Sequence, residues 1–162
     1  MVQIKIFTTG GSIDKLYSTE KSDFVVGAPQ IERILEEGNV TIDYEVESLL
    51  RKDSLDITEG DRQLILERVA QTPHRHIVVT HGTDTMIDTA QALASIQGKV
   101  IVLTGAMRPA AFRETDAAFN VGSAMTAVQT LPEGVYLVMN GRIFDPQRTW
   151  KDVPRDRFIE DA

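Results

Sequence analysis

Short apolar runs alternate along the chain with stretches of helical periodicity. The runs cover residues 4–7, 76–80, 100–104 and 135–139, and Gly, Asn or Thr flanks each of them. Such runs between turn-forming residues are typical of strands that are buried on both faces. Residues 42–47 differ because apolar and acidic side chains alternate there. This alternation predicts a strand with one wet face, near the edge of the sheet.

Between the strands, the spacing of apolar residues predicts helices. Residues 31–35 and 86–94 keep apolar side chains on one helical face, and a longer helix is expected over 116–129. Thr58 precedes Asp61 by three residues, as in a capping box, so another helix should begin there. The helix over 116–129 offers four side chains for packing: Phe119, Val121, Ala124 and Val128.

Strands that alternate with helices predict an α/β fold. We expect a mostly parallel sheet with helices on both faces, in the doubly wound, Rossmann-like arrangement. The chain has 162 residues, of which 42% are hydrophobic, and it shows neither an internal repeat nor an interdomain linker. One domain over residues 1–162 is therefore expected, with no second domain.

The composition narrows the classes of partner. A formal net charge of -7 and a pI near 4.9 argue against nucleic acid, since phosphate binding needs clustered Lys and Arg. The chain has no cysteine and three histidines, so we expect no metal and no cofactor. We find no signal peptide and no apolar stretch of membrane-spanning length. A cytoplasmic protein without membrane contact is expected.

Clusters of polar residues follow the predicted strands. They cover residues 8–12, 53–54, 80–84, 105–109 and 140–151. Sheets of this kind bind ligands at the carboxyl ends of their strands. We therefore expect these clusters to lie together and to form the site of a small molecule.

The first cluster, Thr-Thr-Gly-Gly-Ser over residues 8–12, combines hydroxyl groups with two glycines. Glycine lets backbone N–H groups, such as that of Gly11, approach a carboxylate or an oxyanion. The alternative is a tight strand exit whose hydroxyls cap local backbone groups. The cluster is neither a dinucleotide fingerprint nor a phosphate loop, because G-x-G-x-x-G and G-K-[ST] are both missing.

The cluster over residues 81–85 brings a second hydroxyl, Thr83, and a carboxylate, Asp84, to the same edge of the sheet. Either side chain could instead cap the helix that follows. A hydroxyl nucleophile needs a base, and a partly desolvated lysine held by a carboxylate can take part in that role. Lys151 follows the fifth strand and is the candidate, although a lone exposed lysine is ordinarily a solvated surface charge.

Three segments, in this order, resemble the bacterial-type L-asparaginase family. They are Thr-Gly-Gly-Ser-Ile at 9–13, Val-Thr-His-Gly-Thr-Asp-Thr-Met at 79–86 and Gly-Ala-Met-Arg-Pro at 105–109. The agreement continues from Val-Met-Asn at 138–140 to Lys151. The resemblance implies hydrolysis of L-asparagine to L-aspartate and ammonia through an acyl-enzyme formed on a hydroxyl group.

The same resemblance implies roles for individual residues. Ser12 stands at the position of the family's nucleophile, and Thr83, Asp84 and Lys151 match its Thr-Asp-Lys relay. Ser54 matches the residue that helps to hold the substrate carboxylate. Thr83 and Asp84 are expected to contact the substrate as well.

The chain departs from the family at several positions. The family usually has Thr where Ser12 stands, a change that keeps the hydroxyl. Phe24 replaces a tyrosine that helps to activate the nucleophile, and Tyr17 is the candidate to take over that role. Leu55 stands where a polar residue often contacts the substrate's amino group. Family members also carry a second α/β domain that completes the site of a neighbouring subunit.

Two interpretations of function follow. The first is an asparaginase-type amidohydrolase that acts on a small-molecule amide and closes its site as a homo-oligomer, a dimer or higher. The second is a noncatalytic domain that binds aspartate, asparagine or a related acid. The hydroxyls together with Asp84 and Lys151 favour the enzyme, whereas Phe24 and the missing second domain favour the binding domain. Purely structural turns are the least favoured interpretation, because the three segments match jointly.

Overall fold

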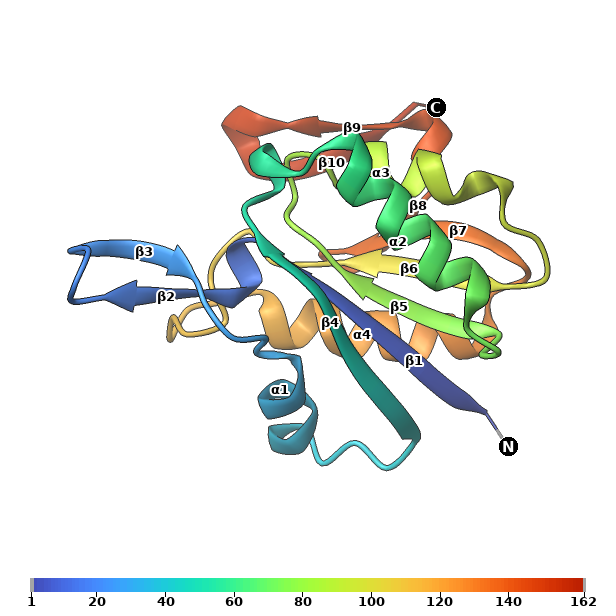
Figure 1. Ribbon diagram of the computed structural model, residues 1–162, viewed down its shortest axis with the longest axis horizontal. Coiled ribbons are helices and arrows are strands. Elements are labelled where there is room, and N and C mark those ends of the chain that lie inside the picture. The colour runs from blue at the N-terminus through green and yellow to red at the C-terminus, as the bar shows by residue number, and fades with distance from the viewer. Residues whose placement is uncertain (1, 162) are drawn as a thin grey trace.

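A six-stranded sheet forms the centre of the molecule in the computed structural model, which describes residues 2–161 (Figure 1). Its order is β4-β1-β5-β6-β7-β8, and all neighbouring strands are parallel except β7 and β8, which are antiparallel. The strands have these bounds: β1 Gln3–Gly10, β4 Asp43–Lys52, β5 His76–Thr80, β6 Val100–Thr104, β7 Gly134–Met139 and β8 Arg142–Phe144.

Helices cover both faces of this sheet (Figure 1). α1 Ile31–Glu37 and α4 Ala117–Thr130 pack on one face, and α2 Glu59–Gln71 and α3 Met86–Ala92 pack on the other. The doubly wound α/β fold expected from the sequence is confirmed.

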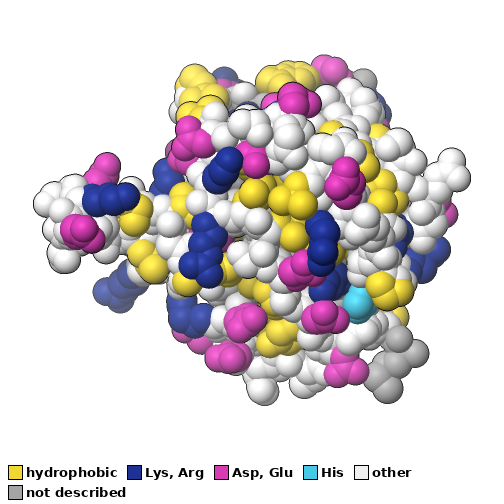
Figure 2. All heavy atoms as spheres, in the orientation of Figure 1, with side chains coloured by type: hydrophobic (Ala, Val, Ile, Leu, Met, Phe, Trp, Pro, Cys, Tyr) yellow, Lys and Arg dark blue, Asp and Glu magenta, His cyan; other side chains and the backbone are white. Residues whose placement is uncertain are grey.

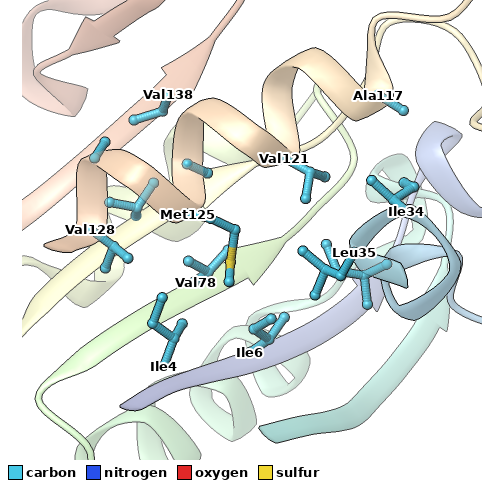
Figure 3. Packing of buried hydrophobic residues seen from close by; sticks show 14 of the residues in the cluster. Ile4, Ile6, Ile34, Leu35, Val78, Ala117, Val121, Met125, Val128 and Val138 are labelled. Atoms are coloured by element: carbon cyan, nitrogen blue, oxygen red, sulfur yellow. The ribbon is translucent and has the colours of Figure 1, made fainter. Parts of the chain in front are cut away.

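Neighbouring residues of β1 pack alternately against the helices on one face of the sheet and those on the other, because successive side chains of a strand point to opposite faces. Ile4 and Ile6 pack in the same cluster as Met125 of α4 (Figure 3). Phe7 packs in the opposite cluster with Ile65 of α2. Both faces are buried, which explains why the strand is read in the sequence as a continuous apolar run.

Most predicted elements are present. β5 and β6 have the predicted bounds, and β4 is an edge strand, as its alternating pattern predicts. Thr58 and Asp61 form the capping box of α2, in which each side chain accepts a hydrogen bond from the other residue's N–H. The expectation that Phe119 packs in the core is wrong, since its side chain is 61% exposed. Its ring lies beside the turn between β7 and β8, where a Cβ atom on Gly141 would be 3.6 Å away.

Two hairpins extend the fold beyond the predicted elements. β2 Lys15–Ser18 pairs with β3 Asp23–Val26, and β9 Thr149–Asp152 pairs with β10 Arg157–Glu160. Each hairpin is a separate two-stranded sheet, so its strands lack the apolar runs that reveal buried strands. The β2–β3 hairpin stands out from the body of the molecule, whereas the β9–β10 hairpin lies apart from the six-stranded sheet, at the top of the view (Figure 1).

Short 3-10 helices fill several connections. They cover Ser12–Asp14, Ser54–Asp56, Leu93–Ser95, Pro146–Arg148 and Val153–Arg155. The first two follow the carboxyl ends of β1 and β4, where polar clusters were predicted.

The order of the parallel strands places a topological switch point between β1 and β5, and we call the region outside the carboxyl ends of these two strands the crevice, as in other sheets of this kind. Counted along the chain, these strands lie in the order second, first, third, fourth and fifth across the sheet. The connection after β1 therefore leads to one side and the connection after β5 to the other. Ligands bind at such a switch point in α/β sheets. Residues 9–12 and 81–85 leave the sheet there.

Candidate active site

Three loops meet at the crevice through glycine residues. A Cβ atom on Gly11 would lie 2.4 Å from the backbone of Gly82, and a Cβ atom on Gly82 would lie 2.6 Å from Cβ of Ser54. Any side chain at either glycine would push the loops apart. The loops that follow β1, β4 and β5 are therefore in direct contact.

Gly11 enters this contact in a conformation that favours glycine, with a φ of 87°. Its N–H donates to the carbonyl oxygen of Lys52 at 2.9 Å, so this N–H is already paired. The Thr9 hydroxyl donates to the carbonyl oxygen of Thr80 at 2.8 Å and ties the same loop to β5. The geometry thus gives Gly11 a role in close approach, since its N–H is not free for a ligand.

Lys151 reaches the crevice from β9. Its Nζ donates to Thr83 Oγ1 at 2.8 Å and to Asp84 Oδ1 at 2.7 Å. The side chain of Lys151 is 14% exposed and that of Asp84 is 39% exposed, so the ion pair is partly desolvated but open to solvent on one side. Lys151 and Asp84 are 67 residues apart in the sequence. The fold nevertheless places all three residues of the predicted relay in hydrogen-bond contact.

His81 supports the loop that carries Thr83. It is fully buried, its Nδ1 donates to the carbonyl oxygen of Gly82 at 2.7 Å, and its Nε2 accepts from the Thr89 hydroxyl at 2.8 Å. Burial lowers the pKa of His81 to about 4, so the ring is neutral at pH 7 and its tautomer is fixed by these two bonds. With both ring nitrogens paired inside the protein, His81 holds the loop that carries Thr83.

Asp14 lies buried two residues after Ser12. Its Oδ1 accepts from the backbone N–H of Gln30 at 2.9 Å, while its Oδ2 has no hydrogen-bond partner among the described residues. Burial raises the pKa of Asp14 to about 7, against the opposing effects of the Gln30 hydrogen bond and the Arg51 charge. This carboxyl group therefore ionises only near neutral pH.

Ser12 and Tyr17 are held less tightly. Ser12 is half-buried at the start of its 3-10 turn, and its hydroxyl has no hydrogen-bond partner within residues 2–161. Tyr17 is 57% exposed and faces Phe24 across the β2–β3 pair, with ring centroids 5.4 Å apart. The register puts both rings on one face of the hairpin. Tyr17 therefore occupies a position next to that of Phe24.

The loop after β4 presents one buried and one exposed residue. Ser54 is buried and its carbonyl oxygen accepts from the Thr85 hydroxyl at 2.8 Å. Leu55 is 72% exposed. Lys15 at the base of the β2–β3 hairpin pairs with Asp53 Oδ2 at 2.9 Å. The same loop thus contacts both the β5 loop and the hairpin.

His81 and Asp14 received no role from the sequence. A histidine between a buried strand and a glycine is the available signal for His81, since both neighbours indicate burial. Asp14 carries no comparable signal, because its burial depends on the hairpin and on the start of α1. Among the predicted residues, Tyr17 lies outside the contacts that join the three loops.

The described residues set further limits on the site. Within residues 2–161, no group of three or more His, Asp or Glu side chains is placed to hold a metal ion. No helix in that range is long and apolar enough to cross a membrane. Acidic and basic side chains are interspersed over the face shown in Figure 2.

Comparison with known proteins identifies a family that this chain matches. The family described as Asparaginase, N-terminal matches residues 3–156. A glutamyl-tRNA(Gln) amidotransferase subunit of Methanococcus maripaludis is 31% identical over 154 residues, which cover 88% of this chain and 36% of that protein. Probable L-asparaginase 1 of Schizosaccharomyces pombe is 30% identical over 158 residues, which cover 86% of this chain and 43% of that protein.

Solved structures of L-asparaginases are also similar to this chain. L-asparaginase I of Vibrio cholerae superposes with a TM-score of 0.85 at 26% identity, over 98% of this chain and 51% of that chain. The thermostable L-asparaginase of Thermococcus kodakarensis gives a TM-score of 0.78 at 27% identity, over 91% of this chain and 47% of that chain. The present chain spans less than half of those two curated relatives and about half of these two solved chains.

The contact between the loops predicts that Gly82→Ala destabilises the folded protein. The added Cβ would lie 2.6 Å from Ser54 Cβ, so the substitution should lower the free energy of unfolding by about 1–3 kcal/mol through overpacking. Gly122→Ala on α4 is the matched control, because its Cβ would have no heavy atom within 4 Å, and it should stabilise by roughly 0.5–1 kcal/mol. Urea denaturation measures both. Equal stability of the two variants would contradict the contact.

Asp14→Asn should remove a pH dependence of stability. The pKa of Asp14 is about 7 in the folded protein against an ordinary 3.8, so between these values the folded state holds a proton that the unfolded state has lost. Wild-type stability from this group therefore falls as pH rises through about 7. Relative to wild type, the variant should gain up to about 3 kcal/mol between about pH 5 and about pH 8. The contribution of His81 is common to both proteins and cancels. A pH-independent difference in the free energy of unfolding would contradict the assignment.

Proposed function

The chain belongs to the asparaginase family, through that family's N-terminal domain, and from this premise we propose that it is an amidohydrolase. We propose that it hydrolyses L-asparagine to L-aspartate and ammonia. The observation that carries the proposal is the contact of Lys151 Nζ with Thr83 Oγ1 and Asp84 Oδ1. A binding site alone has no need of a hydroxyl, an amine and a carboxylate in one hydrogen-bonded row.

In the proposed reaction, a hydroxyl oxygen of Ser12 or Thr83 attacks the carboxamide carbon of the substrate. The C–N bond breaks, ammonia leaves with the proton of that hydroxyl, and an ester remains on the protein. Water then attacks the ester, which releases aspartate and restores the hydroxyl. Lys151 and Asp84 direct the proton transfers at Thr83, and Tyr17 is the candidate to do so at Ser12.

Backbone N–H groups next to the glycine contact would stabilise the developing oxyanion. The N–H of Gly11 is bonded to Lys52 O, whereas those of Ser12 and Thr83 have no acceptor within the described residues. We assign the oxyanion to these two groups, because each follows one of the two glycines in the loop contact. Ser54 and Asp84 are the proposed partners of the substrate's carboxylate and ammonium groups.

One observation favours a second candidate function, a noncatalytic domain that binds aspartate, asparagine or a related acid. The Ser12 hydroxyl has no hydrogen-bond partner within residues 2–161, so neither Tyr17 nor any other described phenol is bonded to it. Ammonia release on addition of L-asparagine distinguishes the two functions directly. Binding without ammonia release would support the second function and exclude the first.

The Lys151–Asp84 ion pair is partly exposed, which leads to a prediction about assembly. Water weakens electrostatic contacts at an open site, so a homo-oligomer that covers the crevice is expected, and a two-fold dimer is the commonest form. One neighbour in structure is a probable cytoplasmic L-asparaginase of Campylobacter jejuni, and we propose the same compartment. Light scattering at assay concentration measures the oligomer. A fully active monomer would refute it.

Removal of the relay amine should abolish most of the activity. Lys151→Met keeps the length of the side chain but loses both hydrogen bonds to Thr83 and Asp84, and kcat should fall on the order of a hundredfold or more. Lys21→Met, in the exposed turn between β2 and β3, is the control and should leave kcat unchanged. An electrophilic asparagine analogue should label Ser12 or Thr83. Labelling of neither residue would rule out the covalent step.

Leu55 is exposed and apolar at a position where a polar residue often contacts the substrate's amino group. Asp84 is then the acid that remains to hold this group, so we expect the amino group to be bound weakly. Succinamic acid lacks this group and should lose only about 1.5–3 kcal/mol of transition-state binding relative to L-asparagine, as for one charged hydrogen bond. Asp84→Asn should erase most of that difference, whereas the exposed control Asp88→Asn should preserve it. The test measures the specificity constants of both compounds with wild type, Asp84→Asn and Asp88→Asn. Micromolar use of L-asparagine with total rejection of succinamic acid would show that another group supplies the grip.

A further inference from the structure

Asp14 lies where several segments of the chain meet, and it is bonded to three of them. Its N–H donates to the carbonyl oxygen of Gly11 at 3.1 Å, which closes the turn that carries Ser12. Its own carbonyl oxygen accepts from the N–H of Gly27 at 2.9 Å, at the end of the β2–β3 hairpin. Its Oδ1 accepts from the N–H of Gln30 at 2.9 Å, at the start of α1. One residue thus joins the candidate nucleophile turn to the chain on the far side of the hairpin.

The residue before Asp14 extends this junction to a fourth segment. The carbonyl oxygen of Ile13 accepts from the N–H of Ala110 at 3.1 Å, in the loop that carries Phe112. Phe112 packs edge-on against Phe24 at 5.3 Å, and Phe24 packs against Tyr17 at 5.4 Å. A closed path of contacts therefore runs from the Ser12 turn through the Phe112 loop and back to the hairpin.

The hairpin depends on its base for its orientation. Among the described residues 2–161, β2 and β3 pair only with each other, and the hairpin stands out from the body of the molecule (Figure 1). The bonds of Asp14 and the Lys15–Asp53 ion pair at 2.9 Å hold that base. An ion pair that is partly exposed contributes little to rigidity. The buried bonds of Asp14 are the stronger constraint.

We propose that Asp14 is a positioning residue, which fixes the hairpin that carries Tyr17 relative to the turn that carries Ser12. The proposal rests on the amidohydrolase function proposed above, because Tyr17 acts there in proton transfer. Catalytic groups must be held close to their working geometry, and a displacement of about 1 Å can lower a rate by two orders of magnitude. Burial of a carboxyl group with one unpartnered oxygen is unfavourable for the fold, and functional sites are where such local conflicts are found.

A purely structural role for Asp14, as a cap for α1, predicts different results. The side chain of Gln30 makes no capping bond of its own, so the Asp14 carboxyl group does serve the start of that helix. Loss of a cap would lower stability and leave the reaction unchanged in the protein that remains folded. A positioning residue instead changes kcat in the folded protein.

The test compares Asp14→Ala, Asp14→Asn and the control Asp23→Ala. Asparagine in place of Asp14 keeps an oxygen acceptor for Gln30, whereas alanine removes it. Asp23 is an exposed acid of the same hairpin that accepts only from the N–H of Phe24. Hydrogen–deuterium exchange of residues 15–30 reports on the hairpin, and residues 117–130 of α4 serve as the internal reference. The kinetics of ammonia release report on the reaction.

For Asp14→Ala we expect exchange over residues 15–30 to rise about tenfold and kcat to fall about tenfold, with KM within about twofold of wild type. Asp14→Asn and Asp23→Ala should stay within about threefold of wild type in exchange and in kcat. Unchanged exchange in Asp14→Ala would show that Asp14 does not hold the hairpin in place, a role that we call the clamp. Faster exchange with unchanged kcat would overturn the positioning role.

The clamp and the proposed function can fail separately. If wild-type protein releases no ammonia from any amide, the proposed function fails, while hydrogen exchange still decides whether Asp14 holds the hairpin. If Asp14→Ala does not fold, amide exchange in the wild type decides the clamp. The Gln30 N–H should be protected, unlike the N–H of Glu32 in the first turn of the same helix. An unprotected Gln30 amide would overturn the clamp.

Discussion

The site depends on a backbone contact that tolerates no side chain. Gly11 and Gly82 approach so closely that a Cβ atom on either would overlap the next loop, and Gly82 meets Ser54 in the same way. The ends of β1 and β5 are fixed by the parallel ladder between them, so the loops inherit the rigidity of the sheet. Ser12 and Thr83, each adjacent to one of these glycines, are placed by the backbone and need no bond of their own for that purpose.

The loop that carries Thr83 has a buried, uncharged side and a partly exposed, charged side. His81, behind the loop, is buried and neutral because desolvation lowers its pKa. Lys151 and Asp84, in front, form a partly exposed ion pair. The charged pair therefore lies on the side of the loop that is open to solvent.

Elements that are buried on both faces could be predicted from the sequence, because their apolar runs are unbroken. β5 and β6 are examples, and the position of the polar clusters at the ends of the strands followed from the parallel order alone. The β2–β3 and β9–β10 hairpins could not be predicted in this way. Their strands are half-exposed, so their apolar and polar residues follow no simple period.

The same limit applies to the residues of the site. Thr83 and Asp84 were predicted from their loop cluster, and Lys151 from its place after the fifth strand and from the family resemblance. Their mutual contact follows from the docking of β9, which no local pattern reveals. The paired N–H of Gly11 depends on Lys52, a residue of another strand. The burial of Asp14 likewise depends on Gln30, beyond the hairpin. Long-range pairings of this kind are properties of the folded chain and are absent from any single window of sequence.

The hairpin that carries Lys151 has a consequence for thermal behaviour. β9 and β10 form their own small sheet outside the six-stranded sheet, and small units with few buried contacts open before a protein unfolds as a whole. Each such opening withdraws the amine from Thr83 and Asp84 while the central sheet stays intact. The proposed amide hydrolysis would therefore be lost at a lower temperature than the melting point of the fold, because it needs these two short strands in place.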